Sequence, residues 1–520
     1  MAVQQGSLLR STLANWMGLA TGLAVTMILA PVTLKYLGTE RFGVYGIVRQ
    51  AIGILMILDL GILGAVNRLM TRYVVVGDQS GVNRVASVSF FLYGAISLVA
   101  MIVSLLGAFF GPAYFHVSSA YRTDAGYLFF LLGLNFVISL MSFPWTGLVY
   151  SYNRFDLYNV GTSGSRLMSL LLVVLAFQCG LVNLAVVGLA MTVPVALQFF
   201  YIRFVARRLN PGLRISPGYA TRAGVREVVG FSLWNLLYNA GFTVIWSSDN
   251  ILIGRLLGSD QVPYYYLPFQ LIIVGQTLVA GMSGALTPIA AGVAAASSAK
   301  DLRSTLVRAT RIAILIALCA NGIMVVMVRS FLPLWIRQPG FEGSWVIYAV
   351  LMGGFWALFA ALPAYNMLLG AGDIRGPAIG MIACGVVIVT SKIVLATWFG
   401  LGLVAIAWGT TVPLLVFAGI YMPWAATRMV GMPLWRLYFQ AYLGPLVCLV
   451  PVLAAGVALV HFFPPANLFI WMLWFAILAL IYVSLSWHIL DEADRARILG
   501  LIKRVRPGVS PLDDEMPPPT

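Results

Sequence analysis

The strongest constraint on the fold is a long succession of apolar stretches separated by short polar segments. Each stretch has about 20 residues, the length of a helix that crosses the hydrocarbon core of a bilayer. Only 9% of the residues are charged, whereas soluble domains carry about 25%. The sequence therefore predicts an all-α integral membrane protein with about fourteen transmembrane helices and excludes a soluble enzyme. The predicted helices are 12–34, 43–66, 86–109, 126–148, 158–179, 184–204, 229–252, 263–290, 309–328, 344–368, 377–398, 403–424, 438–461 and 467–488.

The distribution of positive charge predicts the orientation of the chain. A net charge of +15 on a soluble protein would suggest a nucleic-acid partner. In a membrane protein, Lys and Arg concentrate on the cytoplasmic side instead. With the N-terminus inside, 23 of the 32 Lys and Arg residues are cytoplasmic and six lie on the opposite side. We therefore expect both termini in the cytoplasm and no nucleic-acid partner.

An internal repeat divides the first twelve predicted helices into two sets of six. The stretch LKYLGTERFGVYG (34–46) recurs as GRLLGSDQVPYYY (254–266) at an offset of 220. The tripeptide TVP occurs at 192–194 and again at 411–413, at an offset of 219. Because six is even, both sets enter the membrane from the same side, and an axis along the membrane normal relates them. Such a pair of bundles around a central cavity is a usual frame for alternating access, although a duplicated structural bundle would show the same repeat.

The repeat sets the expected domain boundaries. Residues 1–208 form an N-terminal six-helix lobe, 209–228 a basic cytoplasmic linker and 229–428 a C-terminal six-helix lobe. Two additional transmembrane helices follow within 437–490, and 491–520 are expected to contain a cytoplasmic basic helix and a disordered tail.

Four motifs carry a resemblance to a known group of transporters. They are KYLGTERFGVYG (35–46), LDLGILGAVNR (58–68), NRFDLYN (153–159) and SSDNILIGRLLGSDQVPYYY (247–266). With these motifs, in this order and over roughly residues 8–430, the chain resembles the polysaccharide and O-antigen flippases of the MOP superfamily. That superfamily also contains the MATE drug exporters and the peptidoglycan-lipid flippase.

The resemblance implies a function, a location and partners. A flippase of this kind moves an undecaprenyl-diphosphate-linked oligosaccharide from the inner to the outer leaflet of the bacterial inner membrane. The implied partners are this lipid-linked oligosaccharide and membrane lipids, with a polysaccharide polymerase and export machinery as further candidates. The intact repeat favours a monomer. The two additional helices resemble those of fourteen-helix members, in which they can form a groove for the lipid tail.

Three cations lie furthest from any predicted loop, and we expect them to line the central cavity. They are Arg49, Arg166 and Lys392. Charges within a membrane span nearly always face the bundle interior or a wet cavity, and arginine matches phosphate oxygens with its planar fork. None of the three recurs at the offset position in the other lobe, which favours contact with the substrate over packing. The alternative is that they pair with a buried carboxylate or a helix-end carbonyl and only set packing, or, for Lys392, that it snorkels to the interface.

Two carboxylates, Asp59 and Asp249, fall inside predicted helices and are candidates for ion coupling. A carboxylate in a membrane span can exchange a proton as access alternates, so either residue could couple transport to a proton or sodium gradient. The alternative for Asp59 is a contact to Arg68, Arg72 or a neighbouring helix. The alternative for Asp249 is a link to Arg255 near the outer surface.

Charged residues in the predicted inner loops are candidates for a cytoplasmic gate, in which ion pairs would hold the two lobes together. Ordinary solvated loop charges are the alternative. The candidates are Arg68, Arg72, Arg154, Asp156, Asp373 and Arg375.

No group of residues in the sequence supports catalysis, a metal site or a cofactor. The three histidines, His116, His461 and His488, are scattered at the ends of predicted helices, and no Walker loop or metal-ligand spacing occurs. We therefore predict a transporter without a cofactor, not an enzyme. The leading hypothesis is the flippase. The alternatives are a MATE-like drug or cation exporter, a membrane glycan polymerase or ligase, and a structural partner of an export complex.

Overall fold

The computed structural model describes residues 5–59, 61–229, 233–283, 299–490 and 495. These residues form helices and turns, and no strand occurs among them. Eleven helical segments in the described part are long and apolar enough to cross a membrane. The predicted all-α membrane fold is confirmed.

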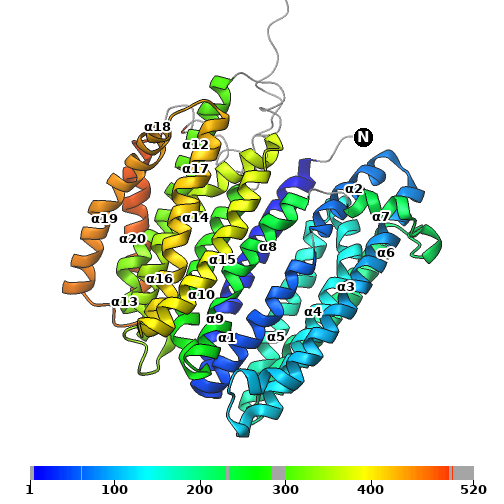
Figure 1. Ribbon diagram of the computed structural model, residues 1–520, viewed down its shortest axis with the longest axis horizontal. Coiled ribbons are helices and arrows are strands. Elements are labelled where there is room, and N and C mark those ends of the chain that lie inside the picture. The colour runs from blue at the N-terminus through cyan, green and yellow to red at the C-terminus, as the bar shows by residue number, and fades with distance from the viewer. Residues whose placement is uncertain (1–4, 60, 230–232, 284–298, 491–494, 496–520) are drawn as a thin grey trace, which may run out of the picture.

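The first lobe contains six helices, five of which are long, and they lie side by side in Figure 1. Its elements are α1 (Gln5–Ile54), η1 (Leu55–Asp59), α2 (Ile62–Val76), α3 (Gln79–Tyr114), η2 (Ser119–Tyr121), α4 (Arg122–Ser151), α5 (Phe155–Gln178) and α6 (Leu184–Leu209).

A short connecting segment follows, which contains η3 (Pro217–Tyr219) and α7 (Arg222–Val229). The segment is held against the first lobe. The Arg214 backbone N–H donates to Asn83 Oδ1 at 3.0 Å, and Tyr73 donates its hydroxyl to Glu227 at 2.7 Å. The predicted basic linker is therefore a packed part of this lobe.

The second lobe contains the helices from α8 to α17, and two further helices pack against α13 at its far side (Figure 1). The elements are α8 (Leu233–Ser247), α9 (Asp249–Leu256), η4 (Ser259–Gln261), α10 (Val262–Ser283), α12 (Ala299–Ala317), η5 (Leu318–Gly322), α13 (Ile323–Ile336), α14 (Trp345–Ala371), α15 (Arg375–Trp398), α16 (Gly402–Leu414), η6 (Leu415–Tyr421), α17 (Met422–Met429), α18 (Leu434–Leu437), η7 (Tyr438–Tyr442), α19 (Leu443–Phe462) and α20 (Leu468–Trp487).

Helices lie at every predicted span, but the number of membrane crossings stays a prediction. The helix α1 carries the first predicted span and most of the second, joined through a kink at Gly38. The predicted spans 229–252 and 263–290 correspond to α8 with α9 and to α10, which are not among the eleven apolar segments. The predicted basic helix and tail lie outside the described residues, except for Arg495.

The stretch 54–73 is not one continuous helix, contrary to the predicted span 43–66. The helix α1 ends at Ile54, a 3-10 turn runs to Asp59, and α2 begins at Ile62 after Gly61. Gly61 has a left-handed backbone (φ 71°), which glycine adopts without steric cost. Asp59 therefore lies at a helix break and not inside a regular helix.

Two local features recur at the predicted offset. Gly38 and Gly258 both have positive φ, of 75° and 104°, where one helix gives way to the next. The Thr192 hydroxyl donates to the Leu131 carbonyl at 2.9 Å. Its counterpart 219 residues later, Thr411, donates to the carbonyl of Val350 at 2.8 Å. These features agree with the repeat, whose symmetry axis remains a prediction.

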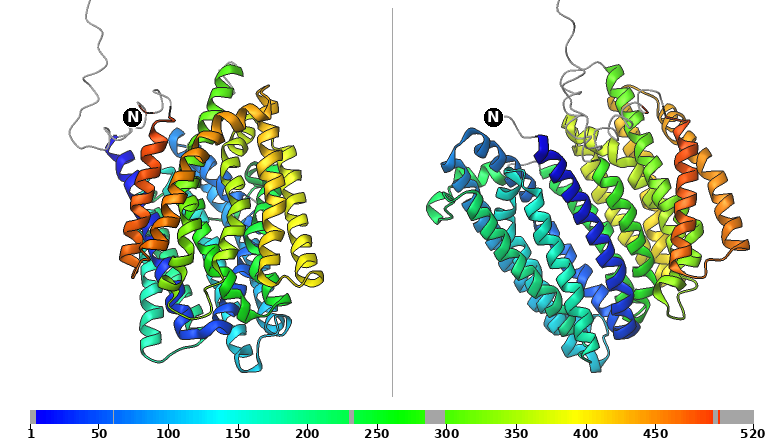
Figure 2. Two further views of the ribbon diagram at one scale, coloured as in Figure 1. Left: turned by 90° about the vertical axis from the view of Figure 1, so that its left-hand side faces the viewer. Right: turned by 180° about the vertical axis from the view of Figure 1, so that it is seen from behind.

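The two lobes meet at one end and diverge toward the end at which the N-terminus lies (Figures 1 and 2). At the narrow end, a β-carbon at Gly43 would overlap the Ser259 carbonyl, so glycine permits this close approach. The Gln50 side chain accepts from the Asn250 backbone N–H at 2.7 Å. The second half of α1 is thus the main contact between the lobes.

Candidate substrate cavity

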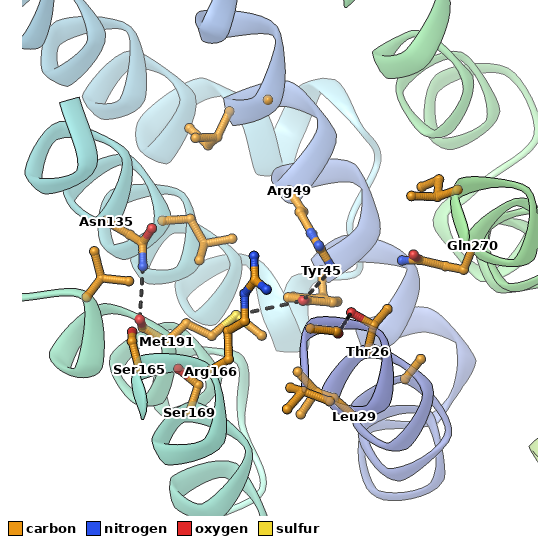
Figure 3. Close-up of a pocket in the computed structure, with 18 of the residues that line it drawn as sticks. Thr26, Leu29, Tyr45, Arg49, Asn135, Ser165, Arg166, Ser169, Met191 and Gln270 are labelled. Carbon is orange, nitrogen blue, oxygen red and sulfur yellow. Dashed lines mark hydrogen bonds between the residues drawn. The ribbon is translucent and has the colours of Figure 1, made fainter. Parts of the chain in front are cut away.

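A cavity of about 650 Å³ lies between α1, α4, α5 and α6 of the first lobe and α10 of the second lobe. Figure 3 shows side chains from these helices converging on it. A volume of this size is within the range of small-molecule sites. The cavity lies partway along the helices, since Arg166 is near the middle of α5.

Small residues on α1 make room for the polar side chains of α5. A β-carbon at Gly22 would overlap the Arg166 guanidinium, and one at Gly18 would overlap the Asn159 amide. The Arg166 Nη1 atom donates to the Gly18 carbonyl at 3.2 Å. The two helices can therefore pack closely while the guanidinium stays exposed at the cavity wall.

The guanidinium of Arg49 joins the two lobes through neutral partners. It donates to the Tyr45 hydroxyl at 3.4 Å, one turn earlier on α1, and to the Tyr266 hydroxyl on α10 at 2.9 Å. Tyrosine hydroxyls orient the guanidinium without cancelling its charge. Arg49 therefore presents a positive charge at the junction of the lobes.

The cavity carries two positive charges and, among its described lining residues, no carboxylate. Within the described part of the chain, neither Arg49 nor Arg166 forms an ion pair. An anion that entered the cavity would gain charge-assisted hydrogen bonds from both guanidinium groups. Arg49 and Arg166 line the same cavity, as the sequence predicts. Their contact with substrate stays a prediction.

The remaining wall combines apolar side chains with amides and hydroxyls. Asn135 donates its amide to the Met191 carbonyl at 2.9 Å, and Gln270 projects from α10 (Figure 3). Amides and hydroxyls can both donate to and accept from the hydroxyls of a sugar. The polar lining residues other than arginine are Thr26, Thr33, Tyr45, Asn135, Ser139, Thr162, Ser165, Ser169, Gln198, Tyr266, Gln270 and Thr277.

The position that corresponds to Arg49 in the second lobe is filled by an aromatic cluster. Phe269, at the offset of 220, lies 5.4 Å from Trp246 and 5.8 Å from Phe355 between ring centroids. Trp246 and Phe355 are 4.8 Å apart. The first lobe contributes the charged wall of the cavity, and the second lobe has a packed aromatic core at the related position.

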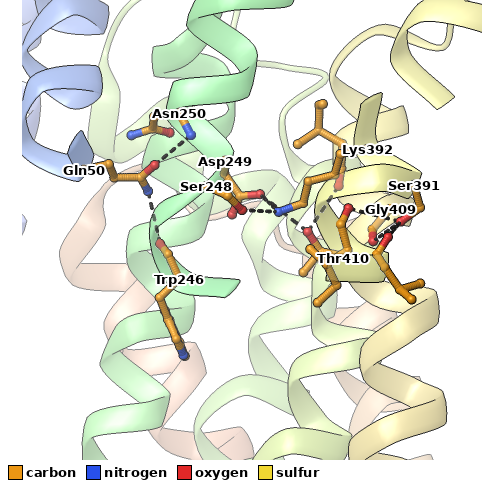
Figure 4. Close-up of polar contacts among 12 residues, drawn as sticks. Gln50, Trp246, Ser248, Asp249, Asn250, Ser391, Lys392, Gly409 and Thr410 are labelled. Carbon is orange, nitrogen blue, oxygen red and sulfur yellow. Dashed lines mark hydrogen bonds and ion pairs between the residues drawn. The ribbon is translucent and has the colours of Figure 1, made fainter. Parts of the chain in front are cut away.

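Lys392 does not line this cavity, in contrast to the expectation that grouped it with the two arginines. It is fully buried in the second lobe, where its ammonium lies 2.5 Å from Asp249 Oδ1 and donates to Ser248 Oγ at 2.9 Å (Figure 4). The side chain of Thr410 donates to the same carboxylate at 3.5 Å. Burial requires this ammonium to be paired, because an isolated charge is costly in such an environment.

The two candidate coupling carboxylates have different surroundings. Asp59 is half-buried and accepts from the hydroxyl of Tyr93 on α3 at 2.6 Å. Asp249 is paired with Lys392, and not with Arg255, which lies beside His116. Asp59 is thus held by a neutral partner, whereas Asp249 is held by a cation.

Most of the candidate gate residues lie near helix ends, whereas Arg68 lies in the middle of α2. Arg154 and Asp156 form a double contact at the start of α5, at 2.9 and 3.1 Å. Arg72 is exposed and lies over the Tyr73 ring. The remaining candidates are Arg68 and Asp373, both exposed, and Arg375, which lies over the Trp234 ring. A gating role for these residues stays a prediction.

Sequence reasoning missed Tyr266, Asn135 and Gln270 as cavity residues. Tyr45 falls within the repeated stretch 34–46, which predicts the repeat but not a cavity position. An uncharged polar residue within an apolar helix can face a neighbouring helix or a cavity, and the sequence does not distinguish the two. The tyrosine run at 264–266, at the end of the second copy of the repeat, is the signal that could have suggested Tyr266.

Comparison with known proteins places these features in a family context. A family model described as "Polysaccharide biosynthesis protein" matches residues 8–293, more than half of the chain. A protein of Shigella flexneri described as "Putative O-antigen transporter" is 20% identical over 434 residues. That alignment covers 81% of this chain and 98% of the relative.

Two solved structures show the same fold. A multidrug resistance MATE family transporter of the MOP superfamily, in an inward-facing conformation, matches with a TM-score of 0.69 at 14% identity, covering 82% of this chain and 98% of that chain. The lipid II flippase MurJ, in an inward closed conformation, matches with a TM-score of 0.66 at 13% identity, covering 92% and 97%. The predicted MOP-superfamily fold is confirmed.

Proposed function

This chain belongs to the polysaccharide biosynthesis protein family, and from that premise we propose that it flips an undecaprenyl-diphosphate-linked oligosaccharide across the bacterial inner membrane. Alternating access of the two lobes would move the diphosphate and the glycan through the cavity. The lipid tail would stay in the bilayer.

The observation that carries this proposal is the charge of the cavity. Two guanidinium groups face it, and its described lining residues include no carboxylate. A diphosphate must lose water to cross the bilayer, and fixed arginines with planar forks can replace that water with charge-assisted hydrogen bonds. The amides and hydroxyls of the wall offer partners to sugar hydroxyls.

The charge of the cavity also separates this proposal from a drug or cation exporter. A cationic substrate would need carboxylates or a neutral aromatic wall, and two uncompensated arginines would repel it. The likeness to the MATE transporter concerns the fold. Fold alone does not identify the substrate.

We propose that the N-terminal end of the bundle faces the cytoplasm and that this conformation accepts substrate from the inner leaflet. The excess of Lys and Arg toward that side supports this orientation. The lobes diverge toward the same end, which supports a conformation that is open to the cytoplasm (Figure 2). The protein would work as a monomer, and a polysaccharide polymerase and export machinery would act next on its product.

We assign ion coupling to Asp59 in preference to Asp249. Asp59 is half-buried at a helix break, and its partner Tyr93 is neutral, so no cation among the described residues holds the carboxylate in its ionised form. Asp249 is neutralised by Lys392 in a fully buried pair. We expect Asp59→Asn to abolish the dependence of flipping on a proton gradient, while Asp260→Asn, at an exposed turn, preserves it. Unchanged gradient dependence in Asp59→Asn would refute the assignment.

The proposed function is tested in a deletion strain of the source bacterium. We expect lipid-linked oligosaccharide to accumulate on the inner leaflet and a surface polysaccharide to be lost. The wild type and the exposed control Arg428→Gln should restore both, whereas Arg49→Gln and Arg166→Gln should not. A normal level of lipid-linked oligosaccharide with increased drug sensitivity would contradict the flippase and support an exporter.

A further inference from the structure

A second cavity, of about 520 Å³, lies between α3, α4 and α6 and the connecting segment at Leu213 and Ile215. It shares no described lining residue with the substrate cavity and uses other faces of α4 and α6. Apart from two arginines and the indole N–H of Trp145, its lining is apolar. The cavity is therefore a separate site with an apolar wall and a charged end.

The charged end consists of Arg203 and Arg207, one turn apart on α6. Both lie over the Trp145 ring, at 5.6 and 5.9 Å from its centroid. Like charges at this spacing on a helix repel each other. Neither arginine forms an ion pair within the described part of the chain. A shared anion would relieve the repulsion, while the aromatic ring keeps both guanidinium groups at the cavity.

Trp145 supplies a further unused donor. Its side chain is only 5% exposed, and its indole N–H has no hydrogen-bond partner among the described residues. Buried donors are nearly always paired in folded proteins. An acceptor oxygen bound between Trp145 and the arginines would satisfy this group.

The position of the cavity relates it to the bilayer. It lies toward the end of α6 that carries the arginines, which the proposed orientation places at the cytoplasmic leaflet. Phe200, which lines the cavity, is 60% exposed, and Phe204, one turn further along α6, is 53% exposed. Exposed aromatic residues on a transmembrane helix face lipid, so the cavity is accessible from the membrane.

We propose that this cavity binds an anionic phospholipid of the cytoplasmic leaflet, with its phosphate on Arg203, Arg207 and the Trp145 N–H. One acyl chain lies along the apolar wall formed by Val137, Met141 and Phe199. Basic pockets between transmembrane helices near the cytoplasmic side are suited to such headgroups. The assignment to the cytoplasmic leaflet rests on the proposed orientation.

The lining argues against the lipid-linked oligosaccharide as the occupant. No Ser, Thr, Asn, Gln or Tyr is among the described lining residues, so a glycan would find no partners for its hydroxyls. A phosphate with an apolar chain needs only cationic donors and an apolar wall, and this cavity has both. A bound lipid would also contact α3, α4, α6 and the connecting segment together, and would stabilise the first lobe.

The test uses the purified full-length protein and measures retention of phosphatidylglycerol and phosphatidylcholine by native mass spectrometry. We expect the wild type to retain phosphatidylglycerol at least tenfold better than phosphatidylcholine. The double variant Arg203→Gln/Arg207→Gln should lose this preference. The charge-matched control Arg208→Gln/Arg222→Gln, with both residues exposed and outside the cavity, should keep it.

Two further results bear on the proposal. Trp145→Phe keeps an aromatic ring and removes the donor, and should weaken phosphatidylglycerol retention severalfold. Equal retention of the two lipids by the wild type, or an unchanged preference in the double variant, would overturn the proposal. Displacement of phosphatidylglycerol by an equal concentration of undecaprenyl phosphate would also overturn it. Because no transport is measured, this outcome is independent of the proposed function.

Discussion

At the scale of single residues, four of the charges predicted inside membrane spans divide into two kinds. Arg49 and Arg166 have uncharged partners and face a cavity, so their charge is available to a ligand. Lys392 and Asp249 cancel each other inside the second lobe. The sequence predicted that all these charges are interior. It could not predict the pairing, because Lys392 and Asp249 are distant in the chain and meet only when α9 packs against α15.

The buried pair gives a prediction about stability. Lys392→Met leaves Asp249 as an unpaired buried carboxylate, and removal of one partner of such a pair costs about 3–5 kcal/mol. The double variant Lys392→Met/Asp249→Asn removes both charges and should recover most of that loss. Thermal unfolding of the purified variants in detergent measures the difference. Equal destabilisation in the single and double variants would show that the pair does not act as a unit.

The chemistry of the cavity arginines gives a second prediction at this scale. Arg166→Lys keeps the charge but loses the planar fork, so a bidentate phosphate contact is lost. We expect about a tenfold lower flipping rate, as one charge-assisted hydrogen bond contributes about 1.5–3 kcal/mol. The conservative variant should retain more activity than Arg166→Gln. If Arg166→Lys flips substrate at the wild-type rate, Arg166 contributes only its positive charge and makes no bidentate contact.

At the scale of elements, the helices follow the apolar stretches to within a few residues at most ends. One exception is the span 309–328, where helices extend from Ala299 to Ile336. Another is the segment from Ile54 to Tyr73, in which an apolar composition gives no sign of the helix break at Gly61. Composition predicts where a chain is buried in lipid, whereas a single left-handed glycine decides where a helix stops. The kinks at Gly38 and Gly258 are of the same kind.

These two kinks give a prediction for glycine substitutions. Gly38 (φ 75°, ψ 175°) and Gly258 (φ 104°, ψ 153°) have backbone conformations that cost other residues about 1–3 kcal/mol. Gly258→Ala should be the more destabilising, because its β-carbon would lie 2.7 Å from Asp260 Oδ1, whereas the space at Gly38 is open. Melting temperatures in detergent measure both effects.

The control is Gly64→Ala, in α2, where the space is open and the backbone is helical. This change should leave stability equal or slightly increased, because alanine favours the helix over glycine. Melting temperatures for Gly38→Ala and Gly258→Ala at or above that of Gly64→Ala would contradict the account of the kinks.

At the scale of the whole molecule, the fold is two lobes that meet through the second half of α1. The paired motifs predicted two lobes that enter the membrane from the same side, and the charge distribution predicted their orientation. They did not predict that the first lobe contributes both arginines of the cavity wall, while a packed aromatic cluster fills the related position in the second lobe. That asymmetry depends on which side chains face inward, and the helices are too uniformly apolar for their sequence to show it.

The close contact at Gly43 gives a prediction about the conformation of the lobes. Gly43→Val would place methyl groups against the Ser259 carbonyl and force the lobes apart at this end. Spin labels at positions 119 and 343, in a background without the four native cysteines, should show a longer distance in Gly43→Val. Gly64→Val, away from the interface, is the control. An unchanged distance would show that this contact does not limit the approach of the lobes.

The central claim is that two arginines in one cavity carry a diphosphate across the membrane. Its most direct test measures flipping of an undecaprenyl-diphosphate oligosaccharide in proteoliposomes that contain the purified protein. The account predicts at least a hundredfold lower rate for Arg49→Gln/Arg166→Gln, since two charge-assisted contacts are lost. The rate for the charge-matched control Arg428→Gln/Arg436→Gln, outside the cavity, should stay within twofold of the wild type. Equal rates in the two double variants would contradict the account.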